Sequence, residues 1–160
     1  MLQHTLMPAV PLLNPEVKRI TAAQTVPLRH KVLRPGRPVN SANFPGDEDP
    51  TTHHLGAFCG QDLLSIASLF MAEMPEQVGR KAFQLRGMAT APQARGRGLG
   101  RQLVAECIRL ARAQNAELVW CNARTSAAEF YRKLGFETVG PEFDIPDVGP
   151  HFRMRLDLTS

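Results

Sequence analysis

Residues 92–100 read Pro92-Gln93-Ala94-Arg95-Gly96-Arg97-Gly98-Leu99-Gly100, a glycine-rich turn between an expected strand and the clearest expected helix. The first N–H groups of a helix have no partner within it, and the helix dipole adds positive potential at the same end. Glycines allow the backbone to approach a ligand closely, and Arg95, Arg97 and Arg101 add positive charge. The stretch therefore predicts an anion site, and a pyrophosphate suits it best.

Two other nucleotide-binding motifs fit this stretch less well. A P-loop ends in Gly-Lys-Ser/Thr, whereas Gly100 is followed by Arg101 and Gln102. A dinucleotide fingerprint requires an acidic residue at the end of the next strand, whereas that strand ends at Cys121 and Asn122. A glycine-rich turn that holds no ligand remains the plainer alternative.

Two segments resemble the GNAT superfamily of N-acetyltransferases. Residues 95–100 have the R-x-x-G-x-G pattern of that family's loop for the acetyl-CoA pyrophosphate. Residues 127–136 look like its A-x-x-F-Y-x-x-x-G-F segment. The two motifs occur in the family's order and are separated by one strand. The resemblance covers about residues 17–158 in element order, and its specific part is residues 85–136.

Periodicity and turn residues predict a mixed sheet flanked by helices. Helices are expected from residue 21 to about 35, at 98–114 and at 126–134, and strands at 17–20, 54–59, 63–70, 82–90, 118–121, 136–139 and 152–158. The resemblance implies the α/β (α+β) GNAT fold: one mixed, mostly antiparallel sheet of about six to seven strands with about four helices. Residues 1–15 are interpreted as an N-terminal extension, and residues 16–160 as the GNAT acetyltransferase domain.

The resemblance also implies direct transfer of the acetyl group of acetyl-CoA to an amine. It gives these residues as those that bind acetyl-CoA: Met88, Ala89, Thr90, Arg95, Gly96, Arg97, Gly98, Leu99, Gly100, Arg101, Asn122 and Tyr131. A backbone N–H near Met88 would polarise the thioester carbonyl, unless it only pairs within the sheet. Asn122 would contact CoA through its amide or simply form a turn. Tyr131, the one tyrosine of the chain, would protonate the CoA sulfur or only pack in the core.

Several side chains are candidates for the base that deprotonates the acceptor. They are Glu73, His53, His54, Asp144 and His151. Residues 149–151, Gly-Pro-His, resemble a segment near the C-terminus of a subset of GNAT proteins, so we take His151 together with Tyr131 as the catalytic pair. A water chain to a distant carboxylate is an alternative.

The acceptor site is expected at the first helix, the loop after it and the C-terminal strands. Arg29, Arg34 and Arg37 could bind a carboxylate or phosphate of the acceptor there. The same three arginines also suit a solvated helix face.

Bulk properties fit a cytoplasmic enzyme. The formal net charge of +4 and a pI of about 9.3 leave a nucleic-acid-binding protein as a weak alternative, since no nucleic-acid motif is present. Pro8 and Pro11 interrupt the apolar N-terminus, so no membrane partner is expected.

The three cysteines lack a Cys-x-x-Cys pair and predict free thiols and no metal site. A non-catalytic acyl-CoA-binding module and a homodimer are left open.

Overall fold

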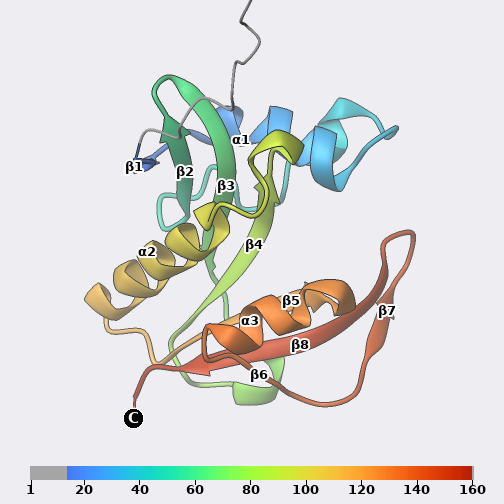
Figure 1. Cartoon of the computed structure of the whole chain (residues 1–160). Helices are drawn as coiled ribbons and strands as arrows, with labels where there is room; N and C mark the ends of the chain where they lie inside the picture. Colours follow the sequence, from blue (N-terminus) through green and yellow to red (C-terminus); the bar gives the residue numbers. More distant parts are fainter. Residues whose placement is uncertain (1–13, 160) are drawn as a thin grey trace, which may run out of the picture.

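The computed structural model describes residues 14–159 and contains one eight-stranded sheet in the order β1-β2-β3-β4-β5-β8-β6, with β7 paired to β8 (Figure 1). The strands are β1 Glu16–Arg19, β2 His53–Cys59, β3 Asp62–Met71, β4 Ala82–Thr90, β5 Leu118–Arg124, β6 Glu137–Thr138, β7 Phe143–Ile145 and β8 Gly149–Asp157. The helices are α1 Ala22–Leu28, α2 Leu99–Ala113 and α3 Ala128–Lys133, with a π-helix η2 at Arg29–Leu33. Short 3₁₀ turns are η3 Val39–Ala42, η4 Pro75–Gln77, η5 Pro92–Ala94 and η6 Thr125–Ala127.

The predicted mixed, mostly antiparallel sheet is confirmed. All neighbouring strands pair antiparallel except β4 and β5. The strand that the sequence did not predict is β7, which has only three residues and lies between Pro141 and Pro146. The proposed N-terminal extension lies almost wholly outside the described residues.

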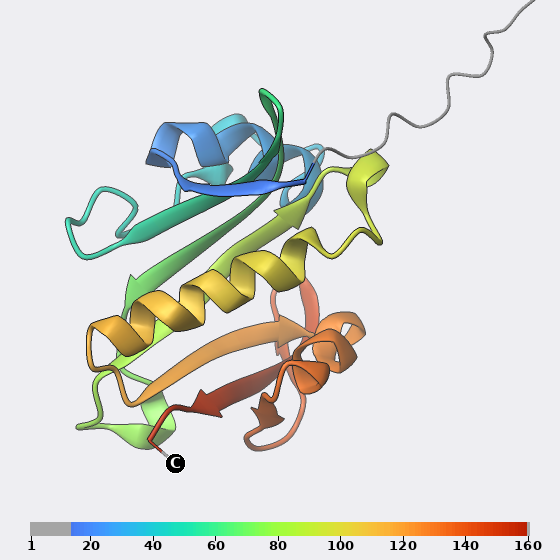
Figure 2. The same cartoon turned by 60° about the vertical axis from the view of Figure 1, so that its left-hand side comes forward.

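Strands β4 and β5 diverge, and this divergence positions the site. Their parallel pairing covers only residues 82–84 of β4 and 118–120 of β5. Beyond these pairs β4 continues to Thr90 and β5 continues to Arg124, and the two strands separate (Figure 2). The carboxyl ends of both strands therefore lie beside an opening in the sheet.

Helix α1 begins with the capping box that the sequence predicts. Thr21 Oγ1 accepts a hydrogen bond from the Gln24 N–H at 3.2 Å, and Gln24 Oε1 accepts one from the Thr21 N–H at 2.8 Å. Pro27 lies inside the helix, and because proline cannot donate to the helical ladder, regular α-helix soon gives way to η2. Thr25 lies inside the helix and is buried.

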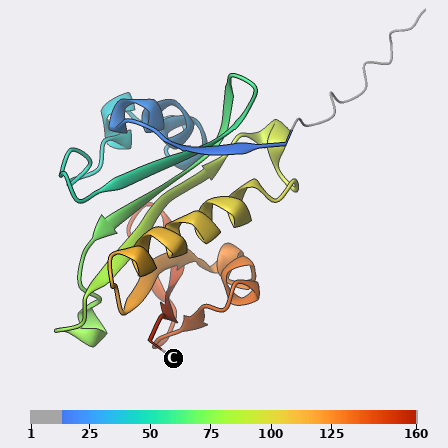
Figure 3. The same cartoon turned by 90° about the vertical axis from the view of Figure 1, so that its left-hand side faces the viewer.

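Helix α2 runs across the front of the strands in Figure 3, and α1 lies behind them. The buried side chains of α2 recur at helical spacing, as the sequence predicts. They are Leu99, Leu103, Val104, Cys107 and Ala111. Burying these side chains against β2, β3 and β4 stabilises the helix and fixes the position of its N-terminus. Among residues 14–159, no helix is both long and apolar enough to cross a bilayer.

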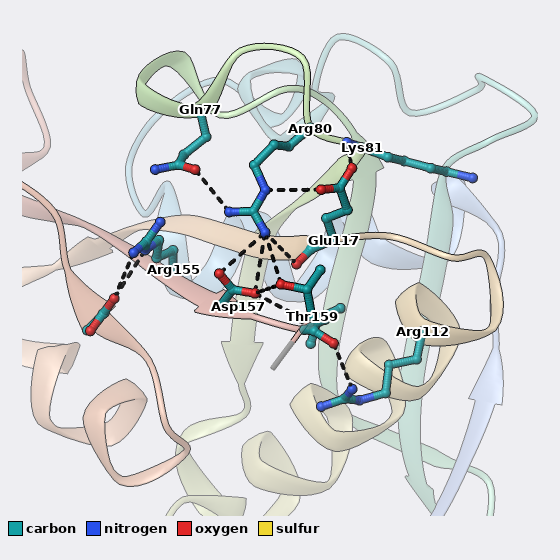
Figure 4. Close-up of polar contacts among 10 residues, drawn as sticks. Gln77, Arg80, Lys81, Arg112, Glu117, Arg155, Asp157 and Thr159 are labelled. Atoms are coloured by element: carbon teal, nitrogen blue, oxygen red, sulfur yellow. Dashed lines mark hydrogen bonds and ion pairs between the residues drawn. The ribbon is translucent and has the colours of Figure 1, made fainter.

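A polar cluster around Arg80 joins the other ends of β4, β5 and β8 (Figure 4). Arg80 Nε donates to Glu117 Oε1 at 3.2 Å, and Nη2 approaches Asp157 Oδ2 at 3.3 Å. Glu117 directly precedes β5, and Asp157 ends β8. The cluster therefore holds the closed end of the sheet, opposite the end where β4 and β5 diverge.

Candidate functional site

The glycine turn forms the N-terminus of α2 as an open arrangement of backbone N–H groups. Gly96 and Gly98 have φ of +78° and +79°, and Gly98 is the N-cap without a side-chain cap. A left-handed residue at this point favours glycine. The first N–H groups of α2 face no capping side chain, so they are free to bind an anion.

A cleft of about 530 Å³, here called the loop cleft, runs along this turn. Its lining includes ten of the twelve residues predicted to bind acetyl-CoA: Met88, Ala89, Thr90, Arg95, Gly96, Gly98, Leu99, Gly100, Arg101 and Tyr131. Phe130 and Leu134 of the α3 segment form the opposite wall. A Cβ on Gly100 would lie 3.4 Å from Phe130 Cζ, so a side chain here would crowd the cleft. The lining fits an extended ligand whose pyrophosphate lies at the helix start.

Arg97 and Asn122, the other two predicted residues, do not line the loop cleft. Arg97 is exposed on the turn. Asn122 lies on the other side of the opening, and its Oδ1 accepts a hydrogen bond from Arg153 Nε at 2.7 Å. The structure thus separates Asn122 from the glycine turn.

A second hollow of about 330 Å³, here called the sheet pocket, lies between the diverging strands. Residues 84–88 of β4 and 121–124 of β5 form its sides, together with Phe44, Ile145 and His151. Met88, Ala127 and Tyr131 line both hollows. A ligand in the loop cleft and one in the sheet pocket can therefore meet at Met88 and Tyr131.

A β-bulge lies at this meeting point. Arg86 pairs with Ser68 and Ala89 pairs with Ile66, so Gly87 and Met88 together oppose Ala67. Gly87 has φ of +67°, as bulges that contain glycine often require. A bulge interrupts the hydrogen bonds of the ladder and is common beside active sites. Sequence analysis missed the bulge, although Gly87 inside a strand was the available signal.

Tyr131 is 7% exposed and packs its ring between Phe130 and Phe136, with centroids 5.0 and 5.5 Å away. Burial raises the pKa of its phenol, with a smaller contribution from Cys121 and Cys107. The hydroxyl is therefore protonated at neutral pH and can donate a proton or a hydrogen bond.

His151 is buried at the wall of the sheet pocket. Its Nδ1 lies 2.7 Å from the Gly149 carbonyl oxygen. A carbonyl only accepts, so Nδ1 carries the proton in the neutral ring and Nε2 keeps its lone pair. This tautomer is suited to accept a proton from a ligand in the pocket.

The other candidate bases lie outside both hollows. His53 is held by Arg19 and Gln114, and burial lowers its pKa. Glu73 accepts a hydrogen bond from the Gly79 N–H, and Asp144 is exposed in β7. The structure therefore brings only His151 of the five candidates to the pocket.

His54 belongs to a structural network around Arg29. Its Nε2 donates to the Asp47 carbonyl at 2.8 Å, and its Nδ1 accepts from the Ser68 hydroxyl at 2.7 Å. Arg29 donates to Ser68 and pairs with the Asp47 carboxylate at 2.7 Å. This network holds the loop of residues 42–47 against the sheet. Arg29 is thus a buried structural residue rather than part of a solvated helix face.

Cys59, Cys107 and Cys121 are free thiols. Burial raises the pKa of both Cys107 and Cys121 to about 12. Cys121 lines the sheet pocket, yet at neutral pH its thiol is protonated and a poor nucleophile.

Comparison with known proteins shows the family to which this fold and these two adjoining hollows belong. Residues 59–138 match the family model of the acetyltransferase (GNAT) domain. The N-acetyltransferase YitI of Bacillus subtilis, whose name marks it as uncharacterized, is 35% identical over 89% of this chain and 96% of its own length. The chain belongs to the GNAT acetyltransferase family.

Solved structures share the fold. The ElaA protein of Escherichia coli superposes with a TM-score of 0.72 and 15% identity, over 89% of this chain and 99% of its own. An aminoglycoside 6'-N-acetyltransferase complexed with coenzyme A gives a TM-score of 0.71 and 15% identity, over 91% of this chain and 98% of its own. The protein is a GNAT-family N-acetyltransferase, and this family uses acyl-CoA.

Proposed function

We propose that the protein transfers the acetyl group of acetyl-CoA directly to an amine, with acetyl-CoA in the loop cleft and the acceptor in the sheet pocket. The observation that carries this proposal is that the two hollows meet at Met88 and Tyr131. Acetyl-CoA supplies an activated thioester, and the chain supplies groups for its phosphates, its carbonyl and its sulfur.

Binding of acetyl-CoA is assigned to the glycine turn. The free N–H groups at the start of α2 would hold the pyrophosphate, and Arg95 and Arg101 at the cleft would add charge. Met88, Ala89 and Thr90 would pair with the extended arm of the ligand. A backbone N–H near Met88, at the bulge, would polarise the thioester carbonyl as an oxyanion donor.

Proton transfers are assigned to His151 and Tyr131. His151 Nε2 would take the proton of the acceptor ammonium, directly or through one water, so that the neutral amine forms its new bond to the acetyl carbon. Tyr131 would donate its phenolic proton to the sulfur as the carbon–sulfur bond breaks, and the second proton lost by the attacking nitrogen as it becomes the amide would restore the phenol. The buried, protonated Cys121 supports direct transfer without an acetyl-cysteine intermediate.

The proposal also includes a cellular compartment and the bounds of the catalytic domain. We place the enzyme in the cytoplasm, where Cys59, Cys107 and Cys121 would remain reduced. Residues 16–160 would form the catalytic domain.

The proposal is tested by titrating wild-type protein with acetyl-CoA and then following thiol release with a panel of amines. Saturable binding with amine-dependent release of free CoA is expected. Saturable binding without release for any amine would instead indicate an acyl-CoA-binding module.

A further inference from the structure

Three arginines from separate elements gather at the sheet pocket. Arg34 follows η2, Arg86 lies in β4 and Arg124 ends β5, and all three line the pocket. Among the residues that the structure describes, no aspartate or glutamate lines it. Within residues 14–159, none of the three arginines forms an ion pair. The pocket therefore has a concentrated positive charge that the protein itself does not neutralise.

The neighbouring Arg29 has a structural role, and its charge is paired with a carboxylate. Arg29 is fully buried and makes two hydrogen bonds to the Asp47 carboxylate, at 2.7 and 3.1 Å. Its charge is thereby neutralised, as a buried charge requires. Among residues 14–159, Arg34, Arg86 and Arg124 have no carboxylate within ion-pair distance, so their charges are available to a ligand.

Aromatic rings, in place of acids, position two of these guanidinium groups. Phe44 lies under Arg86 at 4.7 Å and under Arg34 at 5.5 Å, measured from Cζ to the ring centroid, and Phe70 contacts Arg86 at 5.4 Å. Cation–π contacts of this kind position the group through the ring face and do not use its N–H donors, although Arg34 Nη1 also donates to the Leu33 carbonyl at 3.1 Å.

Burial and mutual repulsion act on the charged forms of Arg34 and Arg86. Burial lowers the pKa of Arg34, and repulsion from Arg37, Arg124 and Arg29 lowers it further. Burial also lowers the pKa of Arg86, with repulsion from Arg29 and Arg34, and the Asp47 carboxylate opposes this shift only in part. An anion bound among these groups would offset the repulsion between them.

We propose that Arg34, Arg86 and Arg124 bind an anionic group of the acceptor, so that the acceptor is a small amine that also carries a carboxylate or a phosphate. The inference rests on the proposed function and specifies its acceptor. Planar guanidinium groups match both anions with paired hydrogen bonds. The volume of about 330 Å³ suits a small molecule.

The same charge excludes other amines. His151 and Tyr131 also line this pocket, so the anion and the reacting amine of one molecule would both be bound there. Polyamines and aminoglycosides carry several positive charges, and like charges brought together weaken binding. The pocket therefore distinguishes this chain from an enzyme for polycationic acceptors.

The test uses pairs of amines that differ only in the anionic group. O-phosphoethanolamine is compared with ethanolamine, and phenylalanine with phenethylamine, and spermidine represents polycations. Calorimetry measures their binding to the full-length protein with and without CoA, and thiol release from acetyl-CoA measures turnover. The variants are Arg34→Gln, Arg86→Gln and Arg124→Gln, with Arg86→Lys to retain charge and Lys31→Gln as control, because Lys31 is exposed on η2 outside the pocket.

We expect at least one anionic amine to bind about 10- to 100-fold more tightly than its neutral partner, and each Arg→Gln change to remove much of that preference. Lys31→Gln should keep it, and Arg86→Lys should keep part of it. Absence of preference in both pairs, or a preference that survives all three Arg→Gln changes, would overturn the inference. Binding without CoA separates this outcome from failure of the proposed function, which would appear as absent acetyl-CoA binding or absent turnover.

Discussion

At the scale of single residues, the sequence identifies Tyr131 as a candidate site residue more clearly than it identifies His151. Tyr131 lies in a recognisable segment, and in the structure it lines both hollows. His151 was one of five candidates, because sequence spacing does not show which of several distant side chains share a pocket. The Gly149 carbonyl that sets its tautomer is a tertiary detail.

Tyr131→Phe tests the role of the hydroxyl as an acid. The change keeps the aromatic packing against Phe130 and Phe136, so the protein should fold normally. Protonation of the sulfur matters mainly in the transition state. We expect kcat to fall about 100-fold, the lower end for general-acid catalysis, with little change in acetyl-CoA affinity. Unchanged kcat would make Tyr131 a packing residue.

His151→Asn tests the base. The Asn amide can still donate toward the Gly149 carbonyl, but no group remains at the position of Nε2. We expect kcat to fall about 100-fold or more, while acetyl-CoA binding measured by calorimetry stays the same. Full turnover in this variant would transfer the role of base to a water chain.

At the scale of elements, the sequence predicted the order and most strands, because apolar alternation and glycine or proline turns mark them locally. It did not predict β7, which is too short for alternation to appear, or the β4 bulge, which depends on the register with β3. Strand β5 proved longer than expected, since residues 122–124 are more polar and pair with β8. Divergence of β4 and β5 likewise depends on tertiary pairing.

The bulge gives a prediction on stability. A Cβ on Gly87 would lie 3.1 Å from Arg29 Nε and 3.3 Å from Phe44 Cε2, and φ is +67°. Gly87→Ala should therefore destabilise the fold by about 2–4 kcal/mol, from backbone strain plus crowding. Gly140→Ala is the matched control, with φ of +79° and no atom within 4 Å, and should cost only about 1–2 kcal/mol.

Denaturant unfolding of both glycine variants gives the comparison. Equal losses of unfolding free energy for Gly87→Ala and Gly140→Ala would mean that Arg29 and Phe44 shift to make room for the added Cβ at no cost. A larger loss for Gly87→Ala supports a rigid contact between the network and β4.

At the scale of the whole molecule, the sheet is closed at one end by the Arg80 cluster and open at the other, where the site lies (Figures 1 and 4). No local pattern indicates this arrangement, because Arg80, Glu117 and Asp157 are far apart in sequence. Hydrogen bonds from Thr159, together with nearby Arg80, lower the pKa of Asp157 from 3.8 to about 2.

Asp157→Asn should lower the Tm at neutral pH. The folded-state pKa is the lower one, so the contribution of Asp157 to stability is present above about pH 4 and is lost as pH falls toward 2. The Tm difference between wild type and variant should therefore narrow below pH 4. The effect should be small, because the pairs are at the surface. A difference that is constant from pH 7 to pH 3 would contradict ionisation as its cause.

The central claim is that acetyl-CoA binds with its pyrophosphate at the glycine turn, and calorimetry of Gly98→Asp beside Gly98→Asn tests it most directly. Asp and Asn have nearly the same shape and both tolerate the left-handed conformation of residue 98, where a Cβ meets only Arg101 Nη2 at 3.9 Å. They differ in charge. We expect acetyl-CoA to bind Gly98→Asp about 10-fold or more weakly than Gly98→Asn. Equal affinity of the two variants would contradict a pyrophosphate at this turn.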